Sequence, residues 1–461
     1  MSTQHTLEFR PHDVLFFRDG RPMSGSTHGD GCHFPHPHIL HAALHAALHR
    51  AFPDPTSAGH THRKIRRNRP KEYQTRQERV LNDQRTVRFG SLKSVGPFPA
   101  IRSNNQLSVA FPAPANLLID RGSTDPQSLT PVVAANPKHL PGVSSLPEPL
   151  TMAPAPLLPP AKREPAKWIS KAGLEAWLAN SPPKSIPPDS LFNHQNFFDG
   201  ESTIGIAIDP ATGTTRESQF YSKTQMRLRP DALLVGFASM ESHHHQNEDH
   251  HLLSQLFPQR GKIFLGGEQR ICEVNLNQDA GISTMLPLGP AIAGRFIKWL
   301  LLSPAVFPWL PPSQQRTKPH PGGWLPNWID PADFSVKLLD GPGKAKAERT
   351  GTKPGQPIGA KLVSAQIPRP IIITGWSSYG ENRTEASDPD ALGARSTLLA
   401  VPAGSIYYFE ANDTAEALKL AAALNWHGAN PASGEVANRR STLFGEKGFG
   451  LGVCGPWQPL D

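Results

Sequence analysis

The stretch Leu443–Trp457, LFGEKGFGLGVCGPW, lies near the end of the chain and is dense in glycine. Its glycines are Gly445, Gly448, Gly450, Gly452 and Gly455. Phe449, Leu451 and Val453 alternate with them, which is typical of a strand. Because glycine has no Cβ, such a strand leaves its backbone open to another backbone or to a phosphate group. The stretch therefore predicts either a closing sheet strand with bulges or a glycine loop that binds anions, with Lys447 supplying charge and Phe449 a flat apolar ring.

Two known motifs match parts of this stretch. Gly450, Gly452 and Gly455 fit the dinucleotide fingerprint G-x-G-x-x-G. That fingerprint needs a helix after its last glycine, and Pro456 with the few residues that follow gives no helix. The run KGFG opens like the aromatic motif of RNA-recognition domains, but a leucine and a glycine follow it where an aromatic residue is required. Neither motif is complete.

The composition indicates an irregular, basic protein. The 461 residues are enough for about two or three domains, and the 49 prolines predict long segments outside regular elements. The net charge of +8 favours an anionic partner. Cys32, Cys272 and Cys454 lie far apart and form no metal-type pair or disulfide framework, so we expect a reducing, cytoplasmic setting. We find no signal peptide, and the apolar run Phe296–Phe307 is too short to span a bilayer.

Two insertions stand out. Residues 60–88 form a basic insertion, with ten Lys and Arg and three acidic residues between Arg63 and Arg88. Such a block binds phosphates well, and its alternative is a solvated surface segment. Residues 131–188 contain fourteen prolines, which predict extended chain over the surface, with one short helix at Trp168–Leu178.

The remaining pattern is α+β. A Pro-led helix is expected from Pro37 to about Arg50 and a capped helix at Thr414–Leu424. Strands are expected at Leu7–Phe17, in a hairpin around residues 210–213, and on both sides of a turn at Gly266-Gly267. Further strands are expected at 89–99, 107–118, 227–238, 286–307, 367–376, 396–402 and 405–410, with a short helix at 252–257. Strands and helices do not alternate as parallel βαβ units would.

No catalytic or metal motif is present. His41, His45 and His49 share one side of the first helix, but no glutamate completes HExxH, so we expect them to be the solvated flank of a core-packed helix. The histidines at 243–251 are interpreted as a polar loop. We find no GxSxG, Walker A motif or CxxC pair, and expect no cofactor and no metal.

Several stretches together resemble one family. They are LEFRPHDVLFFRDGRPM, FPHPHILHAAL, LGGEQR, PRPIIITGWS, AVPAGSIYYFE and EKGFGLGVCGPW, which occur in the family's order between Leu7 and Trp457. The chain thus resembles Cmr subunit three, the RAMP protein of type III-B CRISPR effector complexes. The last of these stretches is similar to the glycine-rich C-terminal loop of CRISPR RAMP proteins. The basic and Pro-rich insertions depart from the family's pattern.

The resemblance implies two ferredoxin-like (RRM-like) RAMP domains, which we expect at residues 1–280 and 281–461, the second ending in the glycine-rich loop 445–455. It implies a non-catalytic subunit that binds the 5′ tag of the CRISPR RNA, between the large polymerase-like subunit and the first backbone RAMP subunit, in a hetero-oligomer near target RNA and away from membranes. We expect RNA contacts from the matching blocks, the basic insertion and the tail, at Arg18, Arg21, Arg66, Arg67, Arg69, Arg270, Lys447, Gly448, Phe449 and Gly450.

Two other functions stay open from the residues alone. One is a repeat-processing RAMP endoribonuclease, which would need a positioned histidine base. The other is a general basic RNA-binding module without fixed partners.

Overall fold

The computed structural model describes most of the chain. It covers residues 4–18, 28–29, 34–53, 89–104, 106–119, 121, 129–135, 149–156, 159–162, 165–179, 186–240, 251–278, 281–313, 318–377, 393–394 and 397–459. The basic insertion 60–88 and the histidines at 243–250 lie outside these residues. In the described part, no helix is long and apolar enough to cross a lipid bilayer.

A large antiparallel sheet organises the first half of the chain. Its strands lie in the order β13 (Arg260–Phe264), β14 (Ile271–Asn277), β1 (His5–Pro11), β12 (Ala232–Ser239), β3 (Lys93–Ser103), β4 (Gln106–Pro112), β8 (Trp168–Ser170) and β9 (Leu191–Phe192). At its centre the order is β14–β1–β12–β3, with helix α1 (Pro37–Ala51) between β1 and β3 and helix α5 (Leu252–Leu256) between β12 and β14. The turn predicted at Gly266-Gly267 joins β13 to β14.

Helix α1 covers one face of this sheet. Pro37 stands in its first turn, where a missing N–H costs no hydrogen bond. Leu40, Leu44 and Leu48 recur at helical spacing and are fully buried against strand residues that include Leu7 and Phe9. Each such leucine contributes about 1.5–3 kcal/mol by leaving water. The predicted helix is confirmed.

A second antiparallel sheet organises the later half. It has the order β16 (Ala360–Gln366), β21 (Ile406–Ala411), β15 (Phe296–Leu301) and β22 (Gly452–Pro456). Helix α8 (Thr414–Leu424) follows β21 and packs Ala417, Leu420 and Leu424 on one face. The helix is capped, as expected, and of the two candidate caps, Asp413 and Thr414, it is the Asp413 carboxylate that accepts a 2.8 Å hydrogen bond from the Glu416 N–H. Helix α7 (Lys344–Thr350) lies between β15 and β16.

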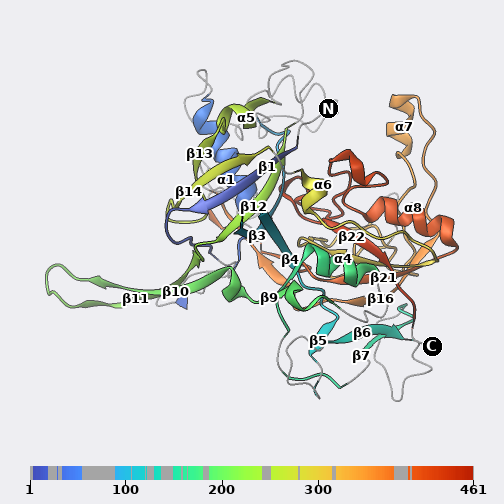
Figure 1. The fold of residues 1–461 in the computed structure, drawn as a ribbon, viewed down its shortest axis with the longest axis horizontal. Coiled ribbons are helices and arrows are strands. Elements are labelled where there is room, and N and C mark those ends of the chain that lie inside the picture. The colour runs from blue at the N-terminus through green and yellow to red at the C-terminus, as the bar shows by residue number, and fades with distance from the viewer. Residues whose placement is uncertain are drawn as a thin grey trace.

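The two sheets share one core. Phe98, Val235 and Phe237 of the large sheet pack with Leu300 and Tyr408 of the second sheet in a single buried cluster. Helices α1 and α8 belong to the clusters on the opposite faces. The body of the protein therefore has two sheets between outer helices (Figure 1). The expected division at residues 280 and 281 falls between the strands of the two sheets, and its two domains remain a prediction.

A long hairpin projects from this body (Figure 1). Its strands β10 (Phe198–Ile208) and β11 (Thr215–Leu228) confirm the predicted hairpin and extend it in both directions. At its base, Arg227 pairs with Glu201 and, at 2.9 Å, with Asp13. Ile204, Ile206 and Ile208 are 63%, 52% and 64% exposed and lie two residues apart, so they share one face of β10.

The Pro-rich region contains more regular structure than the sequence suggested. Between residues 129 and 192 lie β6 (Leu129–Ala135), β7 (Ala153–Pro156), β8, β9 and helix α4 (Lys171–Ala179). Two other expectations need correction. The strand expected at 286–307 is much shorter, since only residues 296–301 form β15, and β16 at 360–366 was not expected. The other short elements are β2 (His28–Gly29), β5 (Leu117–Ile119), β17 (Ile371–Ile373), β18 (Trp376–Ser377), β19 (Gly393–Ala394), β20 (Leu398–Ala400), α6 (Ile282–Met285) and the 3₁₀ turns at 188–190, 194–196, 431–433 and 445–447.

Candidate nucleic-acid interface

The glycine-rich tail folds back between α1 and β3. The 3₁₀ turn Gly445–Lys447 ends at Gly448, whose φ is +91°. A Cβ on Gly448 would lie 3.0 Å from the Ser94 carbonyl oxygen and 3.3 Å from Pro37 Cβ. The tail therefore touches the start of α1 and the start of β3.

The glycines of the tail serve the protein's own packing. Gly450 has φ +75°, and a Cβ there would lie 2.1 Å from the Ser441 backbone nitrogen. Its N–H donates to the Pro304 carbonyl and its carbonyl accepts from the Arg440 N–H, both at 2.8 Å. A Cβ on Gly452 would meet Trp299 Nε1, also at 2.1 Å. The prediction of a backbone left uncovered for a phosphate is corrected, because atoms distant in the sequence already occupy that space.

The Phe449 ring is also unavailable for base stacking. It is fully buried and packs with Val306 and Ile373. Its ring centre lies 5.6 Å from that of Phe444 and 6.0 Å from that of His38. Phe449 thus fixes the tail against α1 and does not offer the exposed ring that the sequence suggested.

Two cationic side chains, Lys447 and Arg439, lie at the tail. The Lys447 ammonium lies 4.9 Å from the centre of the Phe444 ring, and one Arg439 N–H donates to the Val436 carbonyl at 3.3 Å. Burial, followed by the charges of Lys447, His45 and Arg439, lowers the pKa of His41 to about 3. We call Lys447, Arg439 and His41, with its neighbours His36 and His38, the loop cluster.

The imidazoles of the loop cluster are neutral at physiological pH. Burial lowers the pKa of His36 to about 4, and burial with the neighbouring His36 and Lys447 charges lowers that of His38 to about 4. His41 Nδ1 lies 3.2 Å from the Ser94 hydroxyl. Two cations beside neutral imidazoles give an arrangement that can hold a phosphodiester.

The histidine row on α1 is not the solvated flank that we expected. His41, His45 and His49 are half-buried, with ring centres 6.3 Å and 4.6 Å apart in succession. The His49 ring lies 4.9 Å from that of the buried Phe89, which covers this side of the helix. Across the described residues, no group of three His, Cys, Asp or Glu side chains could hold a metal ion.

The other predicted RNA-binding residues lie elsewhere or outside the described residues. Arg18 is exposed. Arg270 lies in the turn between β13 and β14, where it pairs with Glu268 at 2.9 Å and with Asp13 at 3.8 Å. Strand β13 lies near the last turn of α1, where Arg50 contacts the Phe264 ring, whereas the tail touches the first turn of this 15-residue helix at Pro37. The residues outside the described part are Arg21, Arg66, Arg67 and Arg69.

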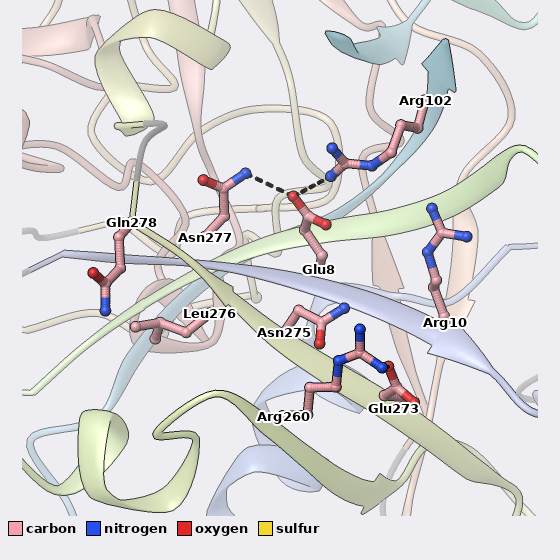
Figure 2. A pocket seen from close by; sticks show the side chains of 9 residues that line it. All are labelled: Glu8, Arg10, Arg102, Arg260, Glu273, Asn275, Leu276, Asn277 and Gln278. Carbon is pink, nitrogen blue, oxygen red and sulfur yellow. Dashed lines mark hydrogen bonds and ion pairs between the residues drawn. The ribbon is translucent and has the colours of Figure 1, made fainter. Parts of the chain in front are cut away.

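A polar groove was missed by sequence reasoning. It lies on the large sheet, encloses about 710 Å³, and brings Arg10, Arg102 and Arg260 together with amide and carboxylate groups (Figure 2). Glu8 and Arg10 alternate with the buried Leu7 and Phe9 along β1. That alternation was the available signal, because it sends charged side chains to the face opposite α1.

Comparisons with known proteins place the chain in a family. No curated protein matches it. Two solved structures that resemble it are described as the type III-B Cmr-beta bound to cognate target RNA and the same assembly bound to cognate target RNA and AMPPnP. Each matched chain is 14% identical, with 87% of this chain and 86% of the other covered, at TM-scores of 0.40 and 0.36. The family model for the CRISPR-associated protein Cas_Cmr3 matches residues 7–457, so the chain belongs to the Cmr3 family.

Proposed function

We propose that this chain is the guide-RNA-binding, non-catalytic subunit of a type III-B effector complex. It holds the 5′ tag of the CRISPR RNA and bridges the large polymerase-like subunit to the backbone RAMP subunits in antiviral defence. The observation that carries this proposal is the family match over residues 7–457. The net charge of +8 agrees with an RNA partner.

Both sheets support the ferredoxin-like assignment. In the first, the β-α-β-β-α-β succession β1, α1, β3, β12, α5, β14 gives the spatial order β14–β1–β12–β3. In the second, β15, β16, β21 and β22 repeat that spatial order as β22–β15–β21–β16, with α8 before the last strand. Two units of one topology, joined by a common core, agree with a RAMP protein.

The loop cluster is the proposed contact for the guide RNA. Lys447 supplies the charge, while Gly448, Phe449 and Gly450 hold the turn that presents it. Replacing Lys447 with Gln in the assembled complex should weaken binding of the tag RNA with no change in melting temperature, since the side chain is partly exposed and adds little to the core.

The hairpin β10–β11 supports a role in assembly. A monomeric soluble protein rarely leaves a continuous row of isoleucines in water, so Ile204, Ile206 and Ile208 fit a surface that a neighbouring subunit covers. The charge pairs at the hairpin base fix the direction in which this row points.

The endoribonuclease alternative receives no support from the histidines near the tail. With pKa values of about 3 to 4, His36, His38 and His41 are weak bases at neutral pH. We expect the purified chain, and its His41→Ala and His45→Ala variants, to leave repeat RNA uncut. Cleavage that one of these substitutions abolished would establish the alternative.

Purification from the native cell tests the proposal directly. The tagged full-length chain should bring down several other subunits and RNA of defined lengths that share one 5′ sequence. Recovery of the chain with RNA of random sequence and no fixed partners would favour a general RNA-binding module and contradict our proposal.

A further inference from the structure

One face of the large sheet changes character halfway across. Val235, Glu8, Asn275 and Arg260 lie opposite one another in a continuous row over β12, β1, β14 and β13. Residues paired in this way point to the same face. Val235 lies in the core under the second sheet, whereas the other three residues are polar. The second sheet therefore covers only part of this face, and the rest forms the groove.

The uncovered part is large enough for a ligand. Its volume of about 710 Å³ falls within the range of about 300–1,000 Å³ that is typical of small-molecule sites. Figure 2 shows Glu8 and Arg102 facing each other above the strands, with Arg10 further along β1. Nearly every side chain that lines the groove is polar, which excludes an apolar ligand.

The charges in the groove leave one arginine unmatched. Glu8 accepts hydrogen bonds from Arg102 at 2.5 Å and from the Asn277 amide at 2.6 Å. Glu273 lies 3.7 Å from Arg260. Arg10 makes no ion pair or side-chain hydrogen bond with any residue in the described part of the chain, although it stands directly opposite Glu273 in the strand register. The groove therefore offers a guanidinium to an incoming anion.

A hydrogen-bond acceptor lies one row away from Arg10. The Asn275 side-chain oxygen is buried and has no hydrogen-bond partner among the described residues. A buried polar atom without a partner destabilises the protein, and a ligand N–H would satisfy this oxygen. Arg10 pairs in register with Glu273, and Glu8 with Asn275, so the anion site and the acceptor belong to adjacent polar rows of one face.

We propose that this groove binds a nucleotide of single-stranded RNA, with a phosphate on Arg10 and Arg260 and a base N–H on Asn275. This inference rests on the proposed RNA-binding function and adds a second contact surface to the loop cluster. A nucleotide supplies both groups that the groove lacks, since it carries anionic oxygens and, on its base, hydrogen-bond donors. An acidic side chain of a partner protein supplies acceptors only.

The test uses the full-length chain and a short fluorescein-labelled single-stranded RNA of mixed sequence. Fluorescence anisotropy gives the affinity over a series of KCl concentrations. The double variant Arg10→Gln/Arg260→Gln should bind roughly tenfold more weakly at low salt, and its log–log salt slope should fall by up to about 1.4. Asn275→Ala should weaken binding without changing the slope, because the amide is uncharged. Arg369→Gln, which removes an exposed arginine of the second half, should change neither.

The outcomes separate the groove from the proposed function. Wild-type affinity and salt slope in the double variant would refute RNA binding in the groove and leave the RNA-binding function of the chain intact. A wild-type chain without any RNA affinity would refute the groove site and the proposed function together. A double variant that bound the RNA like the wild type but no longer co-purified with other subunits would make the groove a protein interface and overturn the proposal. If Arg10→Gln lowered the melting temperature, Arg10→Lys should restore the salt slope, and its failure to do so would contradict the phosphate contact.

Discussion

Replacing Gly450 with Ala should destabilise the protein strongly. Gly450 stands in the tail that joins the second sheet to α1, and its φ of +75° is one that residues with a Cβ rarely adopt. Its backbone is hydrogen-bonded on both sides, to Pro304 and to Arg440. If the backbone of the tail were open to a phosphate, as the sequence suggested, a larger residue at Gly450 would block RNA and leave the fold intact. The structure predicts instead that a larger residue here first disrupts the fold.

The expected loss follows from three contributions. The left-handed backbone costs a residue with a Cβ about 1–2 kcal/mol. The new methyl group would lie 2.1 Å from the Ser441 nitrogen, so the two segments must separate by more than about 1 Å to reach ordinary contact. That separation weakens the two 2.8 Å backbone hydrogen bonds, each of which contributes about 1 kcal/mol. We expect the free energy of unfolding to fall by about 3 kcal/mol or more.

Urea unfolding of three matched variants measures this loss. Gly434→Ala has a similar φ of +65° but no atom within 4 Å of the new Cβ, so it should lose only about 1 kcal/mol. Gly294→Ala has no such φ and no neighbour within 4 Å, so it should be neutral or slightly stabilising. The difference between Gly450→Ala and Gly434→Ala isolates the steric contribution.

One result would refute this reasoning. If Gly450→Ala unfolds at the same urea concentration as Gly434→Ala and binds tag RNA less tightly, the tail backbone contacts RNA and its close contact with Ser441 contributes little. If Gly450→Ala is far less stable than Gly434→Ala, the glycine is explained by packing.

Three further predictions concern other parts of the chain. Burial lowers the pKa of the Lys298 ammonium from 10.5 to about 7, so above pH 7 the unfolded chain holds more protons at this side chain, and Lys298 raises the free energy of unfolding by about 1.4 kcal/mol per pH unit. Lys298→Met should abolish this rise when urea unfolding is compared at several pH values, and an equal rise in the variant would disprove the assignment. The comparison is made below pH 9, because above it the buried Cys272 and Cys454, whose pKa values burial raises, contribute in the opposite direction. Changing Arg66, Arg67 and Arg69 together to Ala should flatten the salt slope of RNA binding by up to about two with little change in melting temperature, and an unchanged slope would leave the basic insertion as a solvated segment. Changing Ile204, Ile206 and Ile208 to Thr should keep the melting temperature and weaken assembly of the complex in size-exclusion chromatography, whereas normal assembly would remove the hairpin from the interface.

Local patterns in the sequence were sufficient for many elements. The leucine spacing from Pro37 onward, the Asp413 cap of α8 and the turn at Gly266-Gly267 each depend on residues close together in the chain. The same holds for the hairpin β10–β11 and for the α+β class. These features follow from backbone periodicity and turn chemistry, which neighbouring residues control.

Only the tertiary structure decided which surfaces these elements expose. Gly450 is enclosed by Ser441 and Pro304, and Arg270 pairs not only with its neighbour Glu268 but also with Asp13, which lies more than 250 residues earlier in the sequence. Arg10 reaches a groove because β1 pairs with β14 in one register and because the second sheet stops short of that edge. Burial and charge pairing depend on residues that meet across the fold, so a glycine loop or an arginine has the same letters in the sequence whether it faces RNA or its own protein.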